Sequence, residues 1–288
     1  MLLVVVIWGL NFPIIKVPLE VMHPLTVNLF RFTVASSVLS ALWLRRSRRL
    51  SEPVWRVWKT HKWKIIGLGL IGHAGYQVLF ILGIKATTAG NAALIISSSP
   101  IWTALLARLL GIDRLSLWQY FALLVSFLGV SVVILGGEYD LTFSDTAFLG
   151  NMLLLAGAML WATYTALNKP LLTSGVPALG LTFFSVLVAM PIFILLGLAT
   201  VAETNWEAVT PTVWIALLFS GGLSTGVAYA LWTYAVREVG PSQTAAFQNL
   251  VPFVALFAAL FLLSEPIRVP QISGGLLIIG GLITMRRL

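Results

Sequence analysis

Polar and aromatic side chains recur inside long apolar stretches of this sequence. A polar group that faces lipid is costly, so such side chains usually face the protein interior or a water-filled cavity. Near the centres of the apolar stretches they are Trp8, Asn11, His73, Tyr76, Gln77, Phe80, Ser97, Ser98, Trp102, Trp161, Tyr164, Tyr229, Trp232, Gln248 and Asn249. We predict that these residues line a pocket and bind a small molecule through aromatic contacts and neutral hydrogen bonds.

Some of these candidates have a structural alternative. The four between residues 73 and 80 are three or four positions apart, so they share one face of a regular helix. His73 is either a packed, hydrogen-bonded histidine or a substrate or proton site. Each serine either lines the pocket or bonds the carbonyl one turn back in its own helix.

The residues needed for catalysis or metal binding are scarce. The chain has no Cys, which excludes disulfides, metal–thiolate sites and thiol nucleophiles. No Asp or Glu lies near the centre of an apolar stretch, so a proton relay between acids, a metal-ligand cluster and a nucleophile with an adjacent base are not expected. We predict no cofactor, no metal and no enzymatic activity. The alternative from another class is a membrane-embedded enzyme that acts on lipid-linked substrates.

Arg31 is the only clear cation well inside an apolar stretch. It could reach outward to the membrane surface, pair with Glu20, or meet a substrate carboxylate. The two structural interpretations are favoured over the substrate contact.

The elements that carry these residues are predicted to be membrane-spanning helices. The 288 residues are 59% hydrophobic and only 10% charged, whereas soluble domains have about 25% charged residues. A span needs about 20 apolar residues, and the chain has ten such segments, the first beginning at the N-terminus. Their approximate limits are 1–19, 25–44, 65–84, 91–110, 117–136, 145–167, 178–201, 211–235, 242–263 and 270–286. The predicted fold is an all-α polytopic membrane protein with ten transmembrane helices.

Basic residues predict the orientation in the bilayer. Eight of the eighteen Lys and Arg residues lie in the segment 45–64, which we interpret as a cytoplasmic loop against anionic lipid and not as a nucleic-acid site. With ten spans, both termini are then cytoplasmic. Trp43, near the end of the second span, is predicted to lie at the membrane–water interface.

An internal repeat divides the chain into two halves. A shift of 152 to 153 residues aligns matching residues in constant register, which are Trp8 with Trp161, Lys16 with Lys169, Pro24 with Pro177, Phe30 with Phe183, Lys85 with Arg237, Pro100 with Pro252, Asp113 with Glu265, Gln119 with Gln271 and Gly129 with Gly281. We predict a first five-helix repeat over 1–137 and a second over 145–288. Five is odd, so the second repeat enters the membrane upside down, as in alternating-access transporters.

The residues that repeat also carry a family resemblance. The segments IWGLNFPIIK (7–16), LFRF (29–32), ATTAGNAALIISSSPIWTALLARLLGIDRLS (86–116) and VGPSQTAAFQNLVPFVALFAALFLLSEPIRVPQISGGLLIIGG (239–281) resemble the EamA-type repeat of the drug/metabolite transporter superfamily. The resemblance implies ten helices in two inverted repeats and transport of small metabolites. Within the family the chain is most similar to bacterial exporters of amino acids, including aromatic ones. It departs from the family pattern at Asp113, where glutamate is usual, and in its serine run.

Prolines and glycines predict which helices move and which form a scaffold. We expect bends at Pro13, Pro100 and Pro252. Glycines such as Gly129 and Gly274 allow close helix approach, so the fifth and tenth helices should pack against each other or a second protomer. Asp113 and Glu265 are predicted to cap these two helices.

The sequence therefore predicts an inner-membrane exporter of small amphipathic metabolites, above all aromatic or apolar amino acids. A transporter of another class, for nucleotide sugars or drug-like compounds, is the alternative. A monomer is expected, with a dimer left open.

Overall fold

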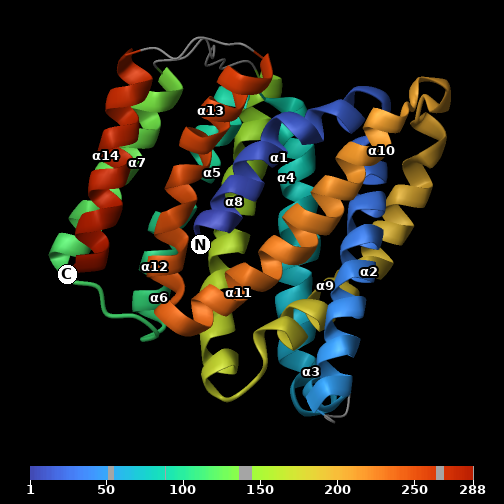
Figure 1. Ribbon diagram of the computed structural model, residues 1–288, viewed down its shortest axis with the longest axis horizontal. Helices are drawn as coiled ribbons and strands as arrows, with labels where there is room; N and C mark the ends of the chain where they lie inside the picture. Colours follow the sequence, from blue (N-terminus) through green and yellow to red (C-terminus); the bar gives the residue numbers. More distant parts are fainter. Residues whose placement is uncertain (51–54, 88, 136–144, 264–268, 288) are drawn as a thin grey trace.

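The computed structural model describes residues 1–50, 55–87, 89–135, 145–263 and 269–287, which are helices joined by short connections (Figure 1). The first five membrane-spanning segments are α1 (Leu2–Val21), α2 (Pro24–Leu50), α3 (Arg56–Leu68) continued by η1 (Gly69–Gly75) and α4 (Tyr76–Ala86), α5 (Ala89–Ile96) followed by α6 (Ser99–Leu109), and α7 (Leu117–Leu135). The other five are α8 (Asp145–Thr173), α9 (Ala178–Thr200), α10 (Pro211–Leu218) continued by η4 (Phe219–Val227) and α11 (Ala228–Val239), α12 (Pro241–Ala246) followed by η5 (Phe247–Asn249) and α13 (Leu250–Leu263), and α14 (Val269–Arg287). The described residues thus form an all-α, multi-pass membrane protein.

The helices differ in how continuously they could cross a bilayer. Six described helices are long and apolar enough to span it, and shorter apolar helices cover Leu94–Leu109, Leu117–Val133 and Val269–Met285. A turn separates α5 from α6, and the 3-10 turn η5 separates α12 from α13. Irregular backbone at membrane depth is tolerated only where protein or a cavity surrounds it. The backbone N–H and C=O groups at these two breaks must therefore find hydrogen-bond partners in the interior of the bundle.

Two π-helical segments at equivalent places interlock the halves. Around Gly69 in η1 the chain is GLIGHAG, and around Gly221 in η4 it is FSGGLSTGV. A Cβ atom on Gly69 would lie 2.6 Å from the carbonyl oxygen of Ser185 in α9, and one on Gly221 would lie 2.6 Å from that of Arg31 in α2. Only glycine permits backbones to approach this closely. The second helix of each half thus packs directly against the π-helix of the other half.

The helices α7 and α14 pack against each other along a glycine-lined contact, as predicted for the fifth and tenth spans (Figure 1). A Cβ atom on Gly129 would lie 2.6 Å from the carbonyl oxygen of Gly274, and one on Gly274 would lie 2.6 Å from that of Gly129. Small residues let membrane helices gain van der Waals contact in this way. The predicted cap Glu265 and the limit of the first repeat at 137 lie outside the described residues.

The cap prediction for Asp113 is wrong. The helix α7 is capped by Ser116 and Gln119, whose side chains each accept a hydrogen bond from the other's backbone N–H, at 3.2 and 2.9 Å. Asp113 Oδ2 accepts a hydrogen bond instead from the backbone N–H of Ser242 at 3.1 Å. Asp113 therefore caps α12 and ties the two halves together, a contact that sequence proximity could not indicate.

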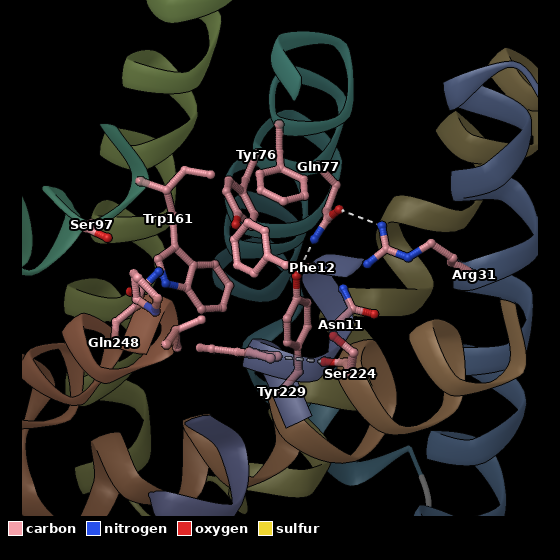
Figure 2. A pocket seen from close by; sticks show the side chains of 15 residues that line it. Asn11, Phe12, Arg31, Tyr76, Gln77, Ser97, Trp161, Ser224, Tyr229 and Gln248 are labelled. Carbon is pink, nitrogen blue, oxygen red and sulfur yellow. Dashed lines mark hydrogen bonds between the residues drawn. The ribbon is translucent and has the colours of Figure 1, made fainter. Parts of the chain in front are cut away.

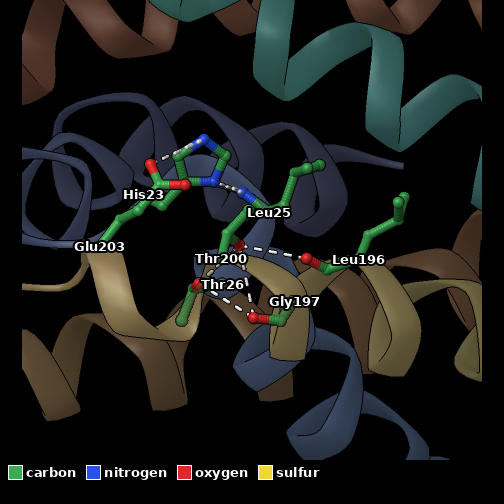
Figure 3. A network of polar contacts seen from close by, with 7 residues as sticks. All are labelled: His23, Leu25, Thr26, Leu196, Gly197, Thr200 and Glu203. Carbon is green, nitrogen blue, oxygen red and sulfur yellow. Dashed lines mark hydrogen bonds and ion pairs between the residues drawn. The ribbon is translucent and has the colours of Figure 1, made fainter.

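The helices α2 and α9 run side by side and are joined by polar contacts at one end (Figure 3). The hydroxyls of Thr26 and Thr200 lie 2.9 Å apart, and Thr26 donates to the carbonyl of Gly197 at 3.3 Å. His23 Nε2 lies 3.8 Å from the exposed carboxylate of Glu203. These contacts fix the turn between α1 and α2 against the end of α9.

The interfacial prediction for Trp43 is also wrong, because its side chain is buried between α2 and α9. Its ring contacts the aromatic rings of Phe183 and Phe184. The glycine at position 180 makes room for it, since a Cβ atom there would lie 2.8 Å from the indole.

Candidate functional site

A small pocket lies where the irregular segments of both halves converge (Figure 2). Its lining residues are Trp8, Asn11, Phe12, Arg31, Tyr76, Gln77, Phe80, Ile96, Ser97, Trp161, Ser224, Tyr229, Gln248, Val251 and Pro252. Its volume is about 60 Å³, which is room for about two water molecules. Nine of the fifteen side chains that the sequence predicts to bind a small molecule therefore line this small space.

Aromatic rings form one wall of this pocket. The repeat-related residues Trp8 and Trp161 meet edge to face with their ring centroids 5.9 Å apart. Tyr76 and Tyr229 each lie beside Trp161, with centroids 5.1 and 5.2 Å from its ring. Rings in these tilted and edge-on arrangements attract one another and offer both a flat apolar surface and polar N–H and O–H groups.

Arg31 lies at the edge of the pocket and is buried, so neither of the favoured structural interpretations describes it. It does not reach the surface, and none of its hydrogen-bond partners among the described residues is Glu20. Its guanidinium donates to Ser220 Oγ at 2.7 Å and to Thr225 Oγ1 at 3.2 Å. It also donates to the amide oxygens of Asn28 and Gln77, at 2.8 and 3.2 Å. Every one of these partners is neutral.

Three polar atoms on the lining side chains have no hydrogen-bond partner among the described residues. They are Asn11 Oδ1, Trp161 Nε1 and Gln248 Oε1. By contrast, Trp8 Nε1 donates to the carbonyl of Ser224 at 3.0 Å. Buried polar atoms are rarely left unpaired because each one costs free energy, and those that are call for an explanation such as ligand binding.

Three predicted residues lie behind the aromatic wall. His73 bonds Ser185 at 3.1 Å and stacks on Tyr229 with centroids 5.1 Å apart, so it matches the packed alternative. Tyr164 stacks on Trp161 with centroids 5.4 Å apart, and Trp232 donates from Nε1 to Thr165 at 3.2 Å. None of the three lines the pocket.

The polar run before Pro100 divides between two roles. Ser97 lines the pocket, whereas Ser98 donates to the carbonyl of Ile95 at 2.6 Å. Ser98 Oγ also accepts a hydrogen bond from Trp102 Nε1 at 3.1 Å, so neither Ser98 nor Trp102 is part of the lining. In the repeat-related run Gln248 lines the pocket and its neighbour Asn249 is buried outside it.

The three predicted hinge prolines occupy different positions in their helices. Pro13 lies inside the continuous helix α1. Pro100 lies in the first turn of α6, and Pro252 in the first turn of α13. A first-turn proline needs no hydrogen-bond donor, so these two begin helices after a break and do not bend one.

Four further residues line the pocket although they were not predicted to do so, namely Phe12, Ile96, Ser224 and Val251. Three are apolar and look like ordinary membrane-helix residues. Ser224 contributes through the π-helix η4, whose wider turns a 3.6-residue period does not follow. The glycine-rich sequence of η4 was the one signal that could have marked this region.

The chain is similar to known transporters over nearly its whole length. The model of the EamA-like transporter family matches residues 1–135 and 148–287, one match in each half. A probable amino-acid metabolite efflux pump of Escherichia coli is 31% identical and is covered over 91% of its length, against 98% of this chain. The uncharacterized transporter YyaM of Bacillus subtilis is 31% identical over 76% of this chain and 71% of its own length.

Two more distant similarities extend this result. A probable terminal-alkyne amino-acid exporter of Streptantibioticus cattleyicolor is 28% identical over 100% of this chain and 92% of its own. A crystal structure with 18% sequence identity superimposes with a TM-score of 0.84 over 99% of this chain and 96% of that one. At this identity the crystal structure supports the fold alone.

Proposed function

Because the chain belongs to the EamA-like transporter family, we propose that it exports small amphipathic metabolites, above all amino acids with aromatic or apolar side chains. It is a membrane transporter and not an enzyme. The observation that carries the proposal is the pocket itself, in which an aromatic wall faces unpaired amide oxygens and a buried guanidinium. An amino acid presents the matching groups, namely an apolar side chain, an ammonium and a carboxylate.

The size of the pocket supports transport by alternating access. Small-molecule sites usually measure roughly 300–1,000 Å³, and the space here is about 60 Å³. A substrate can enter only if the lining helices separate. The breaks next to Pro100 and Pro252 are where such rearrangement is least costly, because the helical hydrogen-bond ladder is already interrupted there. The π-helices η1 and η4 are further places where the regular α-helical hydrogen-bond pattern changes.

The curated relatives support the substrate class. The Escherichia coli protein is named a probable amino-acid metabolite efflux pump, and the Streptantibioticus cattleyicolor protein a probable terminal-alkyne amino-acid exporter. Both similarities cover at least 98% of this chain, so they include the pocket. Neutral amides and aromatic rings around one guanidinium suit a substrate with no net charge.

The proposed setting is the cytoplasmic membrane of a bacterium, with both termini and residues 45–64 in the cytoplasm. The basic residues of that segment support this orientation. The Cys-free chain allows a direct test, in which a single cysteine is introduced at exposed Lys59 or exposed Glu207. An impermeant thiol reagent applied to intact cells should label Glu207→Cys and spare Lys59→Cys, and the opposite result would reverse the orientation.

The transport proposal is tested with purified protein in liposomes loaded with a labelled amino acid. We expect saturable release of phenylalanine, tryptophan and leucine, and little release of aspartate or lysine. Empty liposomes and liposomes with an unrelated membrane protein are the controls. Release of no amino acid above these controls would refute the proposal.

A further inference from the structure

The guanidinium of Arg31 carries a charge that no described neighbour neutralises. Its four hydrogen-bond partners are two hydroxyls and two amide oxygens, and its side chain is only 2% exposed. The ion pairs found among the described residues lie elsewhere, at the ends of helices. A buried unpaired charge in a membrane protein is costly, and such residues commonly mark substrate or ion pathways.

Resting on the proposed function, we propose that Arg31 is the carboxylate-binding residue of the pocket and selects substrates with a free carboxylate. Arg31 lines the pocket from α2. A guanidinium has five N–H donors, of which the described contacts use four, so one donor on Nη2 is left. A carboxylate fits the fork of a guanidinium and would supply the missing negative charge.

Gln77 holds the place that the substrate carboxylate would take. Its amide oxygen accepts from Arg31 Nη1, and its amide nitrogen donates to the hydroxyl of Tyr229 (Figure 2). Gln77 thus links the guanidinium to the aromatic wall and can be displaced when the pocket widens. A carboxylate in place of the neutral amide oxygen of Gln77 strengthens the contact with Arg31, because it adds the attraction of opposite charges and accepts two parallel hydrogen bonds from the guanidinium.

The same end of the pocket offers a partner for the ammonium of an amino acid. Figure 2 shows Asn11 on the side of Trp161 that faces Arg31, with Ser97 and Gln248 on the other side. Asn11 Oδ1 is buried and unpaired. An amino acid would place its charged groups between Arg31 and Asn11 and its side chain along Trp161.

A structural role for Arg31 predicts something different. If Arg31 only held α2 against η4 through Ser220 and Thr225, the charge itself would be unnecessary and a neutral donor would serve as well. Substrate selection would then not depend on the carboxylate. The two roles therefore predict different ratios of transport between a substrate with a carboxylate and one without it, and not only different stabilities.

The test compares phenylalanine with phenylalaninamide, which lacks the carboxylate, in release from proteoliposomes and in thermal stabilisation of the purified chain. Wild type should prefer phenylalanine by about tenfold or more, which corresponds to about 1.4 kcal/mol. Gln77→Glu leaves Arg31 in place and provides an internal carboxylate, so phenylalanine should lose about tenfold while phenylalaninamide is retained. Arg31→Gln should bring the ratio of the two compounds close to one.

Two controls separate charge from position and folding. Gln243→Glu adds the same charge outside the pocket lining, and Arg237→Gln removes an exposed arginine paired with Glu238. Both should keep the wild-type ratio. If Arg31→Gln fails to fold, Gln77→Glu still decides, because it keeps the size of the side chain and the Tyr229 hydroxyl can donate to the new carboxylate instead of accepting from Gln77.

The possible outcomes are distinct. An unchanged ratio in folded Gln77→Glu overturns the inference and leaves the proposed function standing, provided that wild type releases phenylalanine. If wild type releases neither phenylalanine nor any other amino acid tested, the proposed function falls and this inference falls with it.

Discussion

The central pocket and the α7–α14 contact both lie where equivalent elements of the two halves meet, but glycines form the contact whereas aromatic and polar side chains form the pocket. In the contact, Gly129 and Gly274 bring two backbones together so closely that neither can carry a Cβ atom. In the pocket, Trp161 and Gln248 keep polar atoms buried without partners around a small space. Close packing stabilises the first region, whereas unpaired polar atoms destabilise the second.

This difference separates residues that hold the bundle together from residues that the proposed transport requires. A substitution in the contact should lower stability first and transport only as a consequence. A substitution that removes an unpaired polar group from the pocket should lower transport while stability stays constant or rises. Natural sequences retain unfavourable groups of this kind where activity needs them.

The largest effect is expected from Gly129→Leu. Its side chain would displace α14, and overpacking typically costs about 1–3 kcal/mol, with larger values where backbone blocks the new side chain. Thermal unfolding and size-exclusion chromatography in detergent should show an aggregated or strongly destabilised protein. Gly280→Leu on α14 is the matched control, because no atom lies within 4 Å of a Cβ atom there. Equal tolerance of both substitutions would contradict the scaffold role.

The next effect is expected from Gln248→Met, which removes the unpaired amide oxygen with little change in side-chain length. The free energy of unfolding should rise by about 1 kcal/mol, since the cost of an unsatisfied buried group is about 1–3 kcal/mol. Phenylalanine release should fall by about tenfold. Thermal unfolding and proteoliposome release measure the two quantities. A loss of stability together with normal release would place Gln248 among the structural residues.

A smaller effect is expected from a matched pair of substitutions in the repeat-related tryptophans. Trp8→Phe removes a hydrogen bond to Ser224 and should lower stability by about 1 kcal/mol. Trp161→Phe removes the same ring volume but an N–H group without a partner, so it should cost about 1 kcal/mol less than Trp8→Phe. Thermal unfolding of both variants checks the sign of this difference, and a larger loss for Trp161→Phe would show that its N–H group is satisfied.

The smallest effect is expected from Glu203→Gln, three residues after the end of α9. The carboxylate is exposed and lies 3.8 Å from His23, and exposed ion pairs contribute about 0–1 kcal/mol. The unfolding temperature and the rate of phenylalanine release should both remain close to those of wild type. A large change in either would mean that the contacts of Figure 3 take part in the transport cycle.

The fold could be predicted because the length of the apolar segments, the place of the basic loops and the internal repeat are all visible in the sequence itself. Pocket residues such as Trp8, Trp161 and Gln248 were predictable for the same reason, since polar and aromatic side chains are conspicuous within membrane helices. The tight α7–α14 contact followed from glycines that allow close approach.

The failures have identifiable causes. His73 lies in the π-helix η1, so its direction relative to Tyr76 does not follow the 3.6-residue period used to group them. Asp113 bonds a residue 129 positions away, which its place before α7 could not reveal. The two interpretations favoured for Arg31, reaching the surface or pairing with Glu20, failed because three of its four neutral partners lie on other helical segments and are not visible in the local sequence.

The most direct test of the central claim is release of labelled phenylalanine by wild type, Gln248→Met and Gly280→Leu at equal protein content in liposomes. If the pocket carries the substrate, wild type and Gly280→Leu should release phenylalanine at similar saturable rates. Gln248→Met should release it about tenfold more slowly while unfolding at an equal or higher temperature. Equal release by all three proteins would contradict the account.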